Sequence, residues 1–414
     1  MELRPILSSL RRHKTAAAVI VLEIALSCAI VCNALFLIGS RLERMERPSG
    51  IAEETIVRLQ VIGAGQDDND AALTATDLAS IRAIPGVVAA EAVNQVPFWN
   101  SSWNSSVNLE EDQSFQTLSA TTYLAGPQMF EVFDLDLVAG RDFNADEFVE
   151  WEAFSAPNSE VGLPAALITT SMVETMWPDA SPAEAVGRSF YSWGPTPIRV
   201  VGVVERLVRP NDVGGAEGYE FAMLLPVEVP YSLGGNYLIR VDDPARRQEV
   251  LAAAKDIVMR NNPSRIVMDE NSLTIEQMRN DFYREDRAMA WLLVAVIVAL
   301  LVVTALGIVG LASFWVAQRT KQIGVRRALG ATRSQILRYF QTENFLLATI
   351  GIVLGMLMAY GINQLLMERY ELPRLPAMYL PVGAVALWLL GQAAVFGPAR
   401  KAASVPPAVA TRSV

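Results

Sequence analysis

A short basic stretch is the part of the chain whose side chains are best suited to chemistry. Residues 318–342 carry six arginine and lysine residues and no acidic one. No cysteine or histidine stands among them, so their chemistry is binding: they attract lipid phosphates or an acidic or polar protein surface. The stretch contains the sequence KQIGVRRALGA, which is Lys321, Gln322, Ile323, Gly324, Val325, Arg326, Arg327, Ala328, Leu329, Gly330 and Ala331.

Two interpretations of this stretch are equal on its residues alone. It forms a basic helix lying on the lipid surface, or a helix that docks into a groove of a partner protein. Gly324 and Gly330 are poor choices for a plain surface helix, because glycine has a low helix propensity. Four apolar residues give the stretch a side that a partner can bury; they are Ile323, Val325, Leu329 and Ile336.

The rest of the sequence offers little for catalysis. A P-loop needs the pattern G-x-x-x-x-G-K-[ST], whose lysine reaches the phosphates, but none of the four lysines follows a glycine. One histidine and two cysteines, Cys28 and Cys32, are too few for a zinc or thiol enzyme. We therefore expect no enzymatic activity and no metal or cofactor on this chain.

Apolar segments must position the basic stretch. Hydrophobic residues make up 52% of the 414-residue chain, and its mean hydropathy is +0.28, too high for an ordinary soluble protein. A membrane-spanning helix needs about 20 apolar residues. Four segments are candidates, the last being the shortest: residues 15–39, 288–316, 344–367 and 380–397.

The distribution of charge predicts how these spans cross the membrane. Residues 41–287 hold 39 of the 44 acidic residues but only 19 of the 34 basic ones, whereas the other segments between spans are basic or neutral. By the positive-inside rule, basic loops stay in the cytoplasm. The predicted order is a cytoplasmic segment 1–14, the first span, an exported domain 40–287, the second span, a cytoplasmic loop 317–343, the third span, an outer loop 368–379, the fourth span and a cytoplasmic tail 398–414.

The exported domain reads as an α+β domain interrupted by an insertion. A strand–helix–strand order is predicted near its start and again near its end, with turn-rich and strand-rich sequence between. The first unit is Thr55–Val61, Thr76–Ile84 and Val87–Val93; the second is Tyr237–Val241, a helix to about Arg260, and Arg265–Met268. This order predicts one subdomain at about 50–99 and 231–271, with a second at about 100–230 inserted in it.

A stalk is predicted where the exported domain meets the second span. The apolar residues from Leu273 to Phe282 have helical spacing, and no helix breaker precedes the span. One helix over residues 272–316 measures about 65 Å, of which a bilayer core holds about 30 Å. The predicted stalk residues are Glu276, Met278 and Phe282 on this helix, with Arg41 and Arg44 on the continuation of the first span.

Three residues inside the spans have a candidate role. Glu23 is an acid within the first span, where it either serves a proton or cargo path or reaches headgroups and a neighbouring span. Gly351 and Gly355 form a GxxxG pair in the third span, which permits close helix packing within the chain or at a dimer seam. Glu343 is predicted to have a structural role at the head of the third span.

Several segments resemble MacB/FtsX-type permeases, the membrane subunits of a class of ATP-driven transporters. They are QIGVRRALGAT at 322–332, FDLDLVAGRDF at 133–143, the run from ALITT at 166–170 to VVGVV at 200–204, and PARKAA at 398–403. The resemblance implies four membrane helices with a large α+β periplasmic domain of two subdomains between helices 1 and 2, in the bacterial inner membrane. Gln322 stands where the family often has glutamate.

The resemblance also implies function and partners. It implies the permease subunit of an ATP-binding-cassette exporter or mechanotransmission complex, whose cargo is a peptide, an antibiotic-like molecule or a lipid. Its partners are then a cytoplasmic ABC ATPase docked at 321–331, a second permease copy or paralogue, a periplasmic adaptor of the membrane-fusion type and membrane lipid, with no nucleic acid. ATP and Mg²⁺ are then bound by the ATPase. The alternatives are a lipoprotein-release permease of the LolC/LolE type and a membrane scaffold or sensor that regulates a periplasmic partner.

Overall fold

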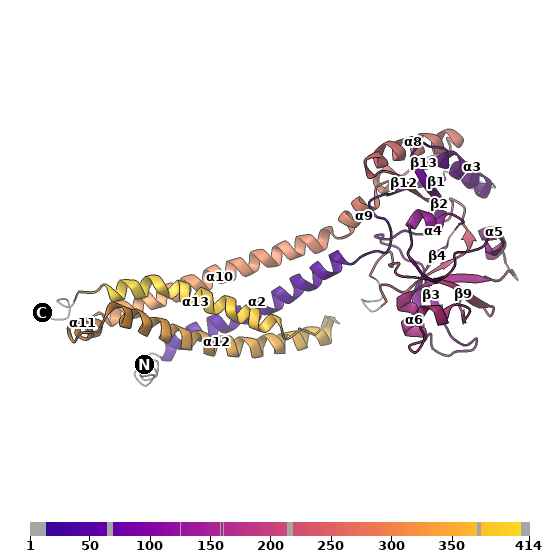
Figure 1. Ribbon diagram of the computed structural model, residues 1–414. Helices are drawn as coiled ribbons and strands as arrows, with labels where there is room; N and C mark the ends of the chain where they lie inside the picture. The colour runs from indigo at the N-terminus through magenta and orange to yellow at the C-terminus, as the bar shows by residue number, and fades with distance from the viewer. Residues whose placement is uncertain are drawn as a thin grey trace. The chain divides into compact units, whose positions relative to one another are not determined.

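The computed structural model describes residues 14–63, 69–124, 126–157, 159, 161–212, 218–370 and 374–406. The chain divides into two compact units (Figure 1). We call residues 1–47 with 285–414 the helical unit, and residues 48–284 the sheet unit. The predicted segment 1–14, apart from Lys14, lies outside the described residues, as do parts of the predicted outer loop and tail.

The helical unit contains four helices long and apolar enough to cross a membrane among the described residues. They are α2 (Lys14–Glu46), α10 (Arg284–Gln318), α12 (Arg333–Tyr370) and α13 (Tyr379–Ala403). Each predicted span falls within one of these helices, so the four-span prediction is confirmed. The shorter α11 (Thr320–Ala328) joins α10 to α12.

Close packing of α2 against α12 explains the glycine pair of the third span. A Cβ added at Gly351 would lie 2.8 Å from Cβ of Ile24, and one added at Gly355 would lie 2.5 Å from Cβ of Cys28. Both glycines therefore let α12 approach α2 within one chain. The buried Asn33 strengthens this contact, because its Nδ2 donates across it to the carbonyl of Ala359 at 3.1 Å.

Two sheets organise the sheet unit (Figure 1). The first is antiparallel with the order β13-β1-β12-β2. Its strands are β1 (Ile56–Gly63), β2 (Val87–Val93), β12 (Asn236–Val241) and β13 (Arg265–Val267), with helices α3 (Asp70–Arg82) and α8 (Arg247–Asn261). Its two halves come from either end of the unit's sequence, because an insertion separates β2 from β12.

The second sheet is built from the insertion and is mixed. Its order is β3-β4-β10-β7-β9-β5, with β8 also paired to β9. The strands are β3 (Asn104–Val107), β4 (Leu118–Leu124), β5 (Leu137–Gly140), β7 (Ala165–Thr169), β8 (Ser189–Tyr191), β9 (Pro197–Val204) and β10 (Ala222–Leu225), and β6 (Val149–Glu150) pairs separately with β11 (Val227–Glu228). The short helices of the insertion are α4 (Met129–Phe133), α5 (Trp151–Ser155), α6 (Thr170–Met176) and α7 (Pro182–Ala185), of which α4 contacts β2 and β12 of the first sheet. The unit's 3-10 turns are Ala145–Glu147, Pro244–Arg246 and Asp269–Asn271.

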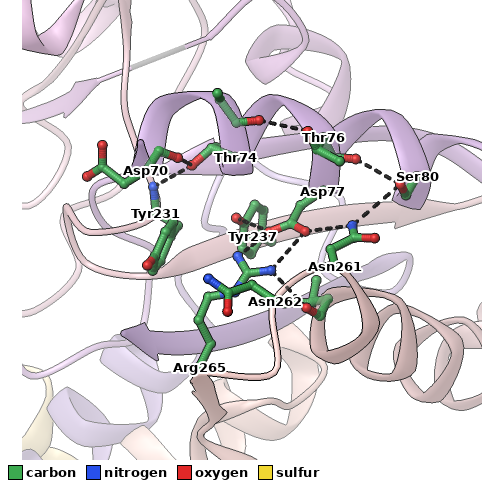
Figure 2. Close-up of polar contacts among 12 residues, drawn as sticks. Asp70, Thr74, Thr76, Asp77, Ser80, Tyr231, Tyr237, Asn261, Asn262 and Arg265 are labelled. Carbon is green, nitrogen blue, oxygen red and sulfur yellow. Dashed lines mark hydrogen bonds and ion pairs between the residues drawn. The ribbon is translucent and has the colours of Figure 1, made fainter. Parts of the chain in front are cut away.

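A buried ion pair ties α3 to β13 in the first sheet (Figure 2). The side chains of Asp77 and Arg265 are fully buried, and Arg265 Nη2 donates to Asp77 Oδ1 at 3.0 Å. Tyr237 Oη donates to Oδ2 of the same carboxylate at 2.7 Å, and Asn261 Nδ2 donates to Oδ1 at 2.8 Å. Burial raises the pKa of the Tyr237 hydroxyl well above its usual range, and the charge of Asp77 adds to this effect, so the hydroxyl remains a donor.

The prediction of one helix over residues 272–316 is wrong. Helix α9 (Ile275–Phe282) begins at a capping box formed by Thr274 and Gln277. It ends before α10, because Tyr283 leaves helical geometry with φ −90° and ψ 13°. The Tyr283 ring is buried against Phe98, with centroids 6.1 Å apart, and this tertiary contact holds the break.

Candidate functional site: the α11 helix

A short loop follows α11, and hydrogen bonds at each end of this loop separate α11 from α12. Gly330 has φ +98°, and its N–H bonds to the carbonyl of Arg327 while the N–H of Ala331 bonds to that of Arg326. This 5→2 and 6→1 pair is the Schellman motif that ends helices. Thr332 then forms a capping box with Gln335 at the start of α12, with bonds of 2.8 and 3.2 Å. The glycine and threonine of the LGAT sequence therefore separate two helices.

The inner face of α11 is anchored to the helical unit. Ile323 and Gly324 are buried. Ile323 belongs to an apolar cluster drawn from α10, α12 and α13, whose other buried members are Val316, Ile336, Phe340, Ala399, Ala402 and Ala403. The prediction that Ile323 and Ile336 are available to a partner is therefore wrong, because the chain's own helices bury both.

The outer face of α11 remains exposed, and we define it as Lys321, Gln322, Val325, Arg326, Ala328 and Leu329. Leu329 is 83% exposed and Val325 is 49% exposed. Arg326 lies over the ring of Tyr339, with its Cζ 5.0 Å from the centroid, while the half-buried Arg327 donates from Nη1 to the carbonyl of Ala331 at 3.3 Å. This surface combines two cations, Lys321 and Arg326, with exposed apolar side chains, a composition suited to protein binding.

An ion pair that sequence reasoning missed lies beside α11. Arg319, the residue between α10 and α11, contacts both carboxylate oxygens of Glu343 through Nη1, at 3.1 and 2.9 Å. Both residues are buried. The predicted end-of-helix place for Glu343 is wrong, since α12 begins at Arg333 and Glu343 lies well inside it. The only available signal was two opposite charges next to predicted spans.

The predicted stalk residues fall into two groups. Arg41 forms an ion pair with Asp286 near the start of α10, and Arg44 Nη1 lies 3.5 Å from the same carboxylate. The other three belong to α9 in the sheet unit: Glu276 pairs with Arg247 at 3.0 Å, Met278 is buried, and the Phe282 ring packs against Phe98. Only Arg41 and Arg44 therefore lie on a span helix.

Glu23 lies at the contact between α2 and α10. A Cβ added at Gly307 of α10 would meet both Glu23 carboxylate oxygens at 2.5 Å, so the glycine makes room for the acid. One turn along, Ser27 and Thr304 share a hydrogen bond of 2.8 Å between their hydroxyls. The structure thus places Glu23 in a polar seam between two helices, which agrees with the neighbouring-span interpretation.

No metal centre is evident in the part of the chain that the structure describes, which holds no group of three histidine, cysteine or carboxylate side chains placed to bind one ion.

The two tryptophans of residues 99–103 make internal contacts. Trp99 stacks on the buried Arg58 guanidinium with 3.9 Å from Cζ to the ring centroid, and Trp103 packs against Trp151. Burial lowers the pKa of Arg58 to about 10.

Comparison with protein families accounts for both units. The MacB-like periplasmic core domain matches residues 18–257, and the FtsX-like permease C-terminal domain matches residues 294–407. The chain belongs to the MacB/FtsX family of ABC transporter permeases. The permease resemblance and the fold expected from it are therefore confirmed, and the chain is a multi-pass membrane protein.

The sequence identity between this chain and individual relatives is low. The chain is 24% identical over 416 residues to the macrolide export ATP-binding/permease protein MacB of Acinetobacter baylyi, and 26% identical over 426 residues to that of a Shewanella species (strain ANA-3). Each match covers 98% of this chain but only 58% and 59% of the relative. The names of both relatives describe an ATP-binding part in addition to a permease.

A solved structure among those that match covers about half of the chain. The extracellular domain of the noncanonic ABC-type transporter YknZ from Gram-positive bacteria aligns with 51% of this chain and all of that domain. The sequences are 16% identical, and the TM-score is 0.31.

Proposed function

We propose that this chain is the permease of an ABC export or mechanotransmission complex, and that the outer face of α11 docks the ATPase. The observation that carries the proposal is the two-sided burial of α11. Ile323 on its inner face is held by α10, α12 and α13, whereas Leu329 and Arg326 face outward. A helix so anchored passes any displacement of its outer face to the spans.

The same proposal assigns orientation and partners. Basic residues gather at α11, the start of α12 and the end of α13, which favours the cytoplasm for this end of the helical unit. The sheet unit is then periplasmic, and the membrane is the bacterial inner membrane. ATP and Mg²⁺ bind to an ABC ATPase, separate or fused. A second permease copy and a periplasmic adaptor complete the complex, and its cargo is a peptide, an antibiotic-like molecule or a lipid.

The docking surface is tested by reversing its charge. Lys321→Glu with Arg326→Glu places two acids against an acidic or polar groove, and Leu329→Asp buries an unpaired charge. Losing one partner of a desolvated charge pair costs about 2–5 kcal/mol, so we expect each variant to weaken ATPase binding at least about tenfold. The measurement is co-purification of the ATPase with membrane-inserted chain, followed by binding in detergent.

A matched control separates protein docking from lipid binding. Arg400 and Lys401 are also adjacent, exposed bases, in the last turn of α13. Their double reversal to glutamate removes the same charge from another helix and should leave ATPase binding intact. Equal binding by all three variants would show that α11 only faces lipid, and the docking proposal would fail.

A further inference from the structure

Helix α10 is held in the helical unit near its start and along its second half. Asp286 and Ala290 are its buried residues near the start, and its others run from Thr304 to Val316. None of residues 291–303 is buried. The attachment near Gln318 is the end of this packed half, next to α11, where motion of α11 first reaches α10.

The Arg319–Glu343 pair is placed at that attachment. Arg319 follows the last residue of α10 and is the N-cap of α11, so it belongs to the joint between the two helices. Glu343 lies on α12, so the pair crosses from this joint to a different helix. The Arg319 guanidinium also lies 5.4 Å from the ring of Trp315, one turn earlier on α10.

The surroundings of the pair leave polar groups unsatisfied. Arg319 Nη2, Trp315 Nε1 and Asn344 Nδ2 are buried and have no hydrogen-bond partner among the residues that the structure describes. Trp315, Glu343 and Asn344 also line one small cavity. Each unpaired buried donor costs free energy, so this arrangement is a poor way to maximise stability. A buried ion pair retained under such conditions is better explained by the specific geometry that it imposes.

We propose that Arg319 and Glu343 form a latch that fixes the α10–α11 joint to α12. While the pair is closed, α10, α11 and α12 move as one body. When it opens, the end of α10 slips relative to α12 and the motion of α11 no longer reaches the rest of α10. Both are positioning residues. That they fix the joint is inferred from geometry alone, whereas the role of the latch in force transmission rests on the proposed function.

Distance measurement on the whole chain tests the latch without any ATPase. Spin labels are placed at Gln318 on α10 and Arg338 on α12, both exposed, after Cys28 and Cys32 are replaced by alanine. The labelled parent, in lipid nanodiscs, should give one narrow distance distribution. Glu343→Gln should lower the ratio of latched to unlatched chains at least about tenfold, the effect of removing one member of a buried pair.

Two further variants separate a latch from a general packing contribution. The charge swap Arg319→Glu with Glu343→Arg should restore the narrow distribution, since the pair is re-formed in reverse. Asp286→Asn removes the ion pair at the other end of α10 and should leave the Gln318–Arg338 distribution unchanged. A narrow distribution in Glu343→Gln, or broadening in Asp286→Asn equal to that in Glu343→Gln, overturns the latch.

Adding the ATPase tests the role in transmission. Glu343→Gln leaves the outer face of α11 intact, so the ATPase should still co-purify. An ATP analogue should alter hydrogen exchange in the first turns of α10, near Arg284–Ala290, in the parent complex but not in this variant. Failure of the parent to bind an ATPase would refute the proposed function while leaving the distance result valid. Retained exchange changes in Glu343→Gln would refute transmission through the latch.

Discussion

Two buried arginine–carboxylate pairs, one in each unit, are satisfied to very different degrees. The Asp77 carboxylate receives hydrogen bonds from Arg265, Tyr237 and Asn261, and only Nε of Arg265 lacks a partner. Arg319 reaches Glu343 through a single nitrogen, amid three donors that lack partners. The first pair belongs to a closed network, which favours one rigid arrangement.

This difference indicates which buried contact of the two units can open most easily. Breaking the Asp77 network would leave several buried polar groups without hydrogen-bond partners at once, so the first sheet is expected to move as a rigid frame. Opening the Arg319–Glu343 pair removes hydrogen bonds from fewer polar groups, because some neighbouring donors already lack a partner. Rigidity therefore belongs to the sheet unit's core, and a movable contact belongs to the joint beside α11.

The largest expected effect comes from breaking the closed network. Asp77→Asn leaves the buried Arg265 charge uncompensated and should destabilise the sheet unit by about 3–5 kcal/mol. The measurement is urea unfolding of the purified full chain, followed by protease sensitivity of residues 48–284. Asp134→Asn is a matched control in the exposed pair with Arg240, where about 0–1 kcal/mol is expected. Equal losses in both variants would contradict the comparison.

Replacing each pair by apolar residues should sharpen the contrast. Asp77→Leu with Arg265→Met removes the acceptor that Tyr237 and Asn261 use, and should still cost about 1–3 kcal/mol. Arg319→Met with Glu343→Leu removes a pair whose neighbours are already unpaired, so stability should stay nearly unchanged. Thermal unfolding of both double variants gives the comparison. A larger loss for the Arg319 variant would reverse our ranking of the two pairs.

The smallest effect tests a single bond of the network. Tyr237→Phe removes the hydroxyl that donates to Asp77 and should cost about 1 kcal/mol. The ring remains, so packing is preserved, and the same urea assay can detect the change. An unchanged free energy of unfolding would mean that the other donors to Asp77 compensate for the lost hydroxyl. The network would then be less tightly closed than its geometry indicates.

Features with a local signal could be predicted from the sequence. Span length and hydropathy located α2, α10, α12 and α13, and strand-forming residues located β2 at Val87–Val93 with the structure's own bounds. The basic stretch that contains Arg326 and Leu329 was noticed because residues 318–342 carry six bases and no acid between two spans. These patterns depend only on neighbours in the chain.

Features set by tertiary contact could not be predicted in this way. The break at Tyr283 exists because its ring is buried against Phe98, far away in sequence. Whether Ile323 faces a partner or the chain itself depends on where α12 and α13 lie. The Arg319–Glu343 pair was missed because α12 begins ten residues before Glu343 rather than at it, so the acid was placed at a helix end.

The register of the first sheet has a consequence for how such a chain can diversify. Val93 and Asn236 are directly paired in β2 and β12, so residues 94–235 leave the frame and return to it at adjacent points. A segment whose two ends meet is, to its host, equivalent to a hairpin turn of arbitrary content. The inserted segment can thus change in its loops and exposed residues without altering how β2 and β12 pair.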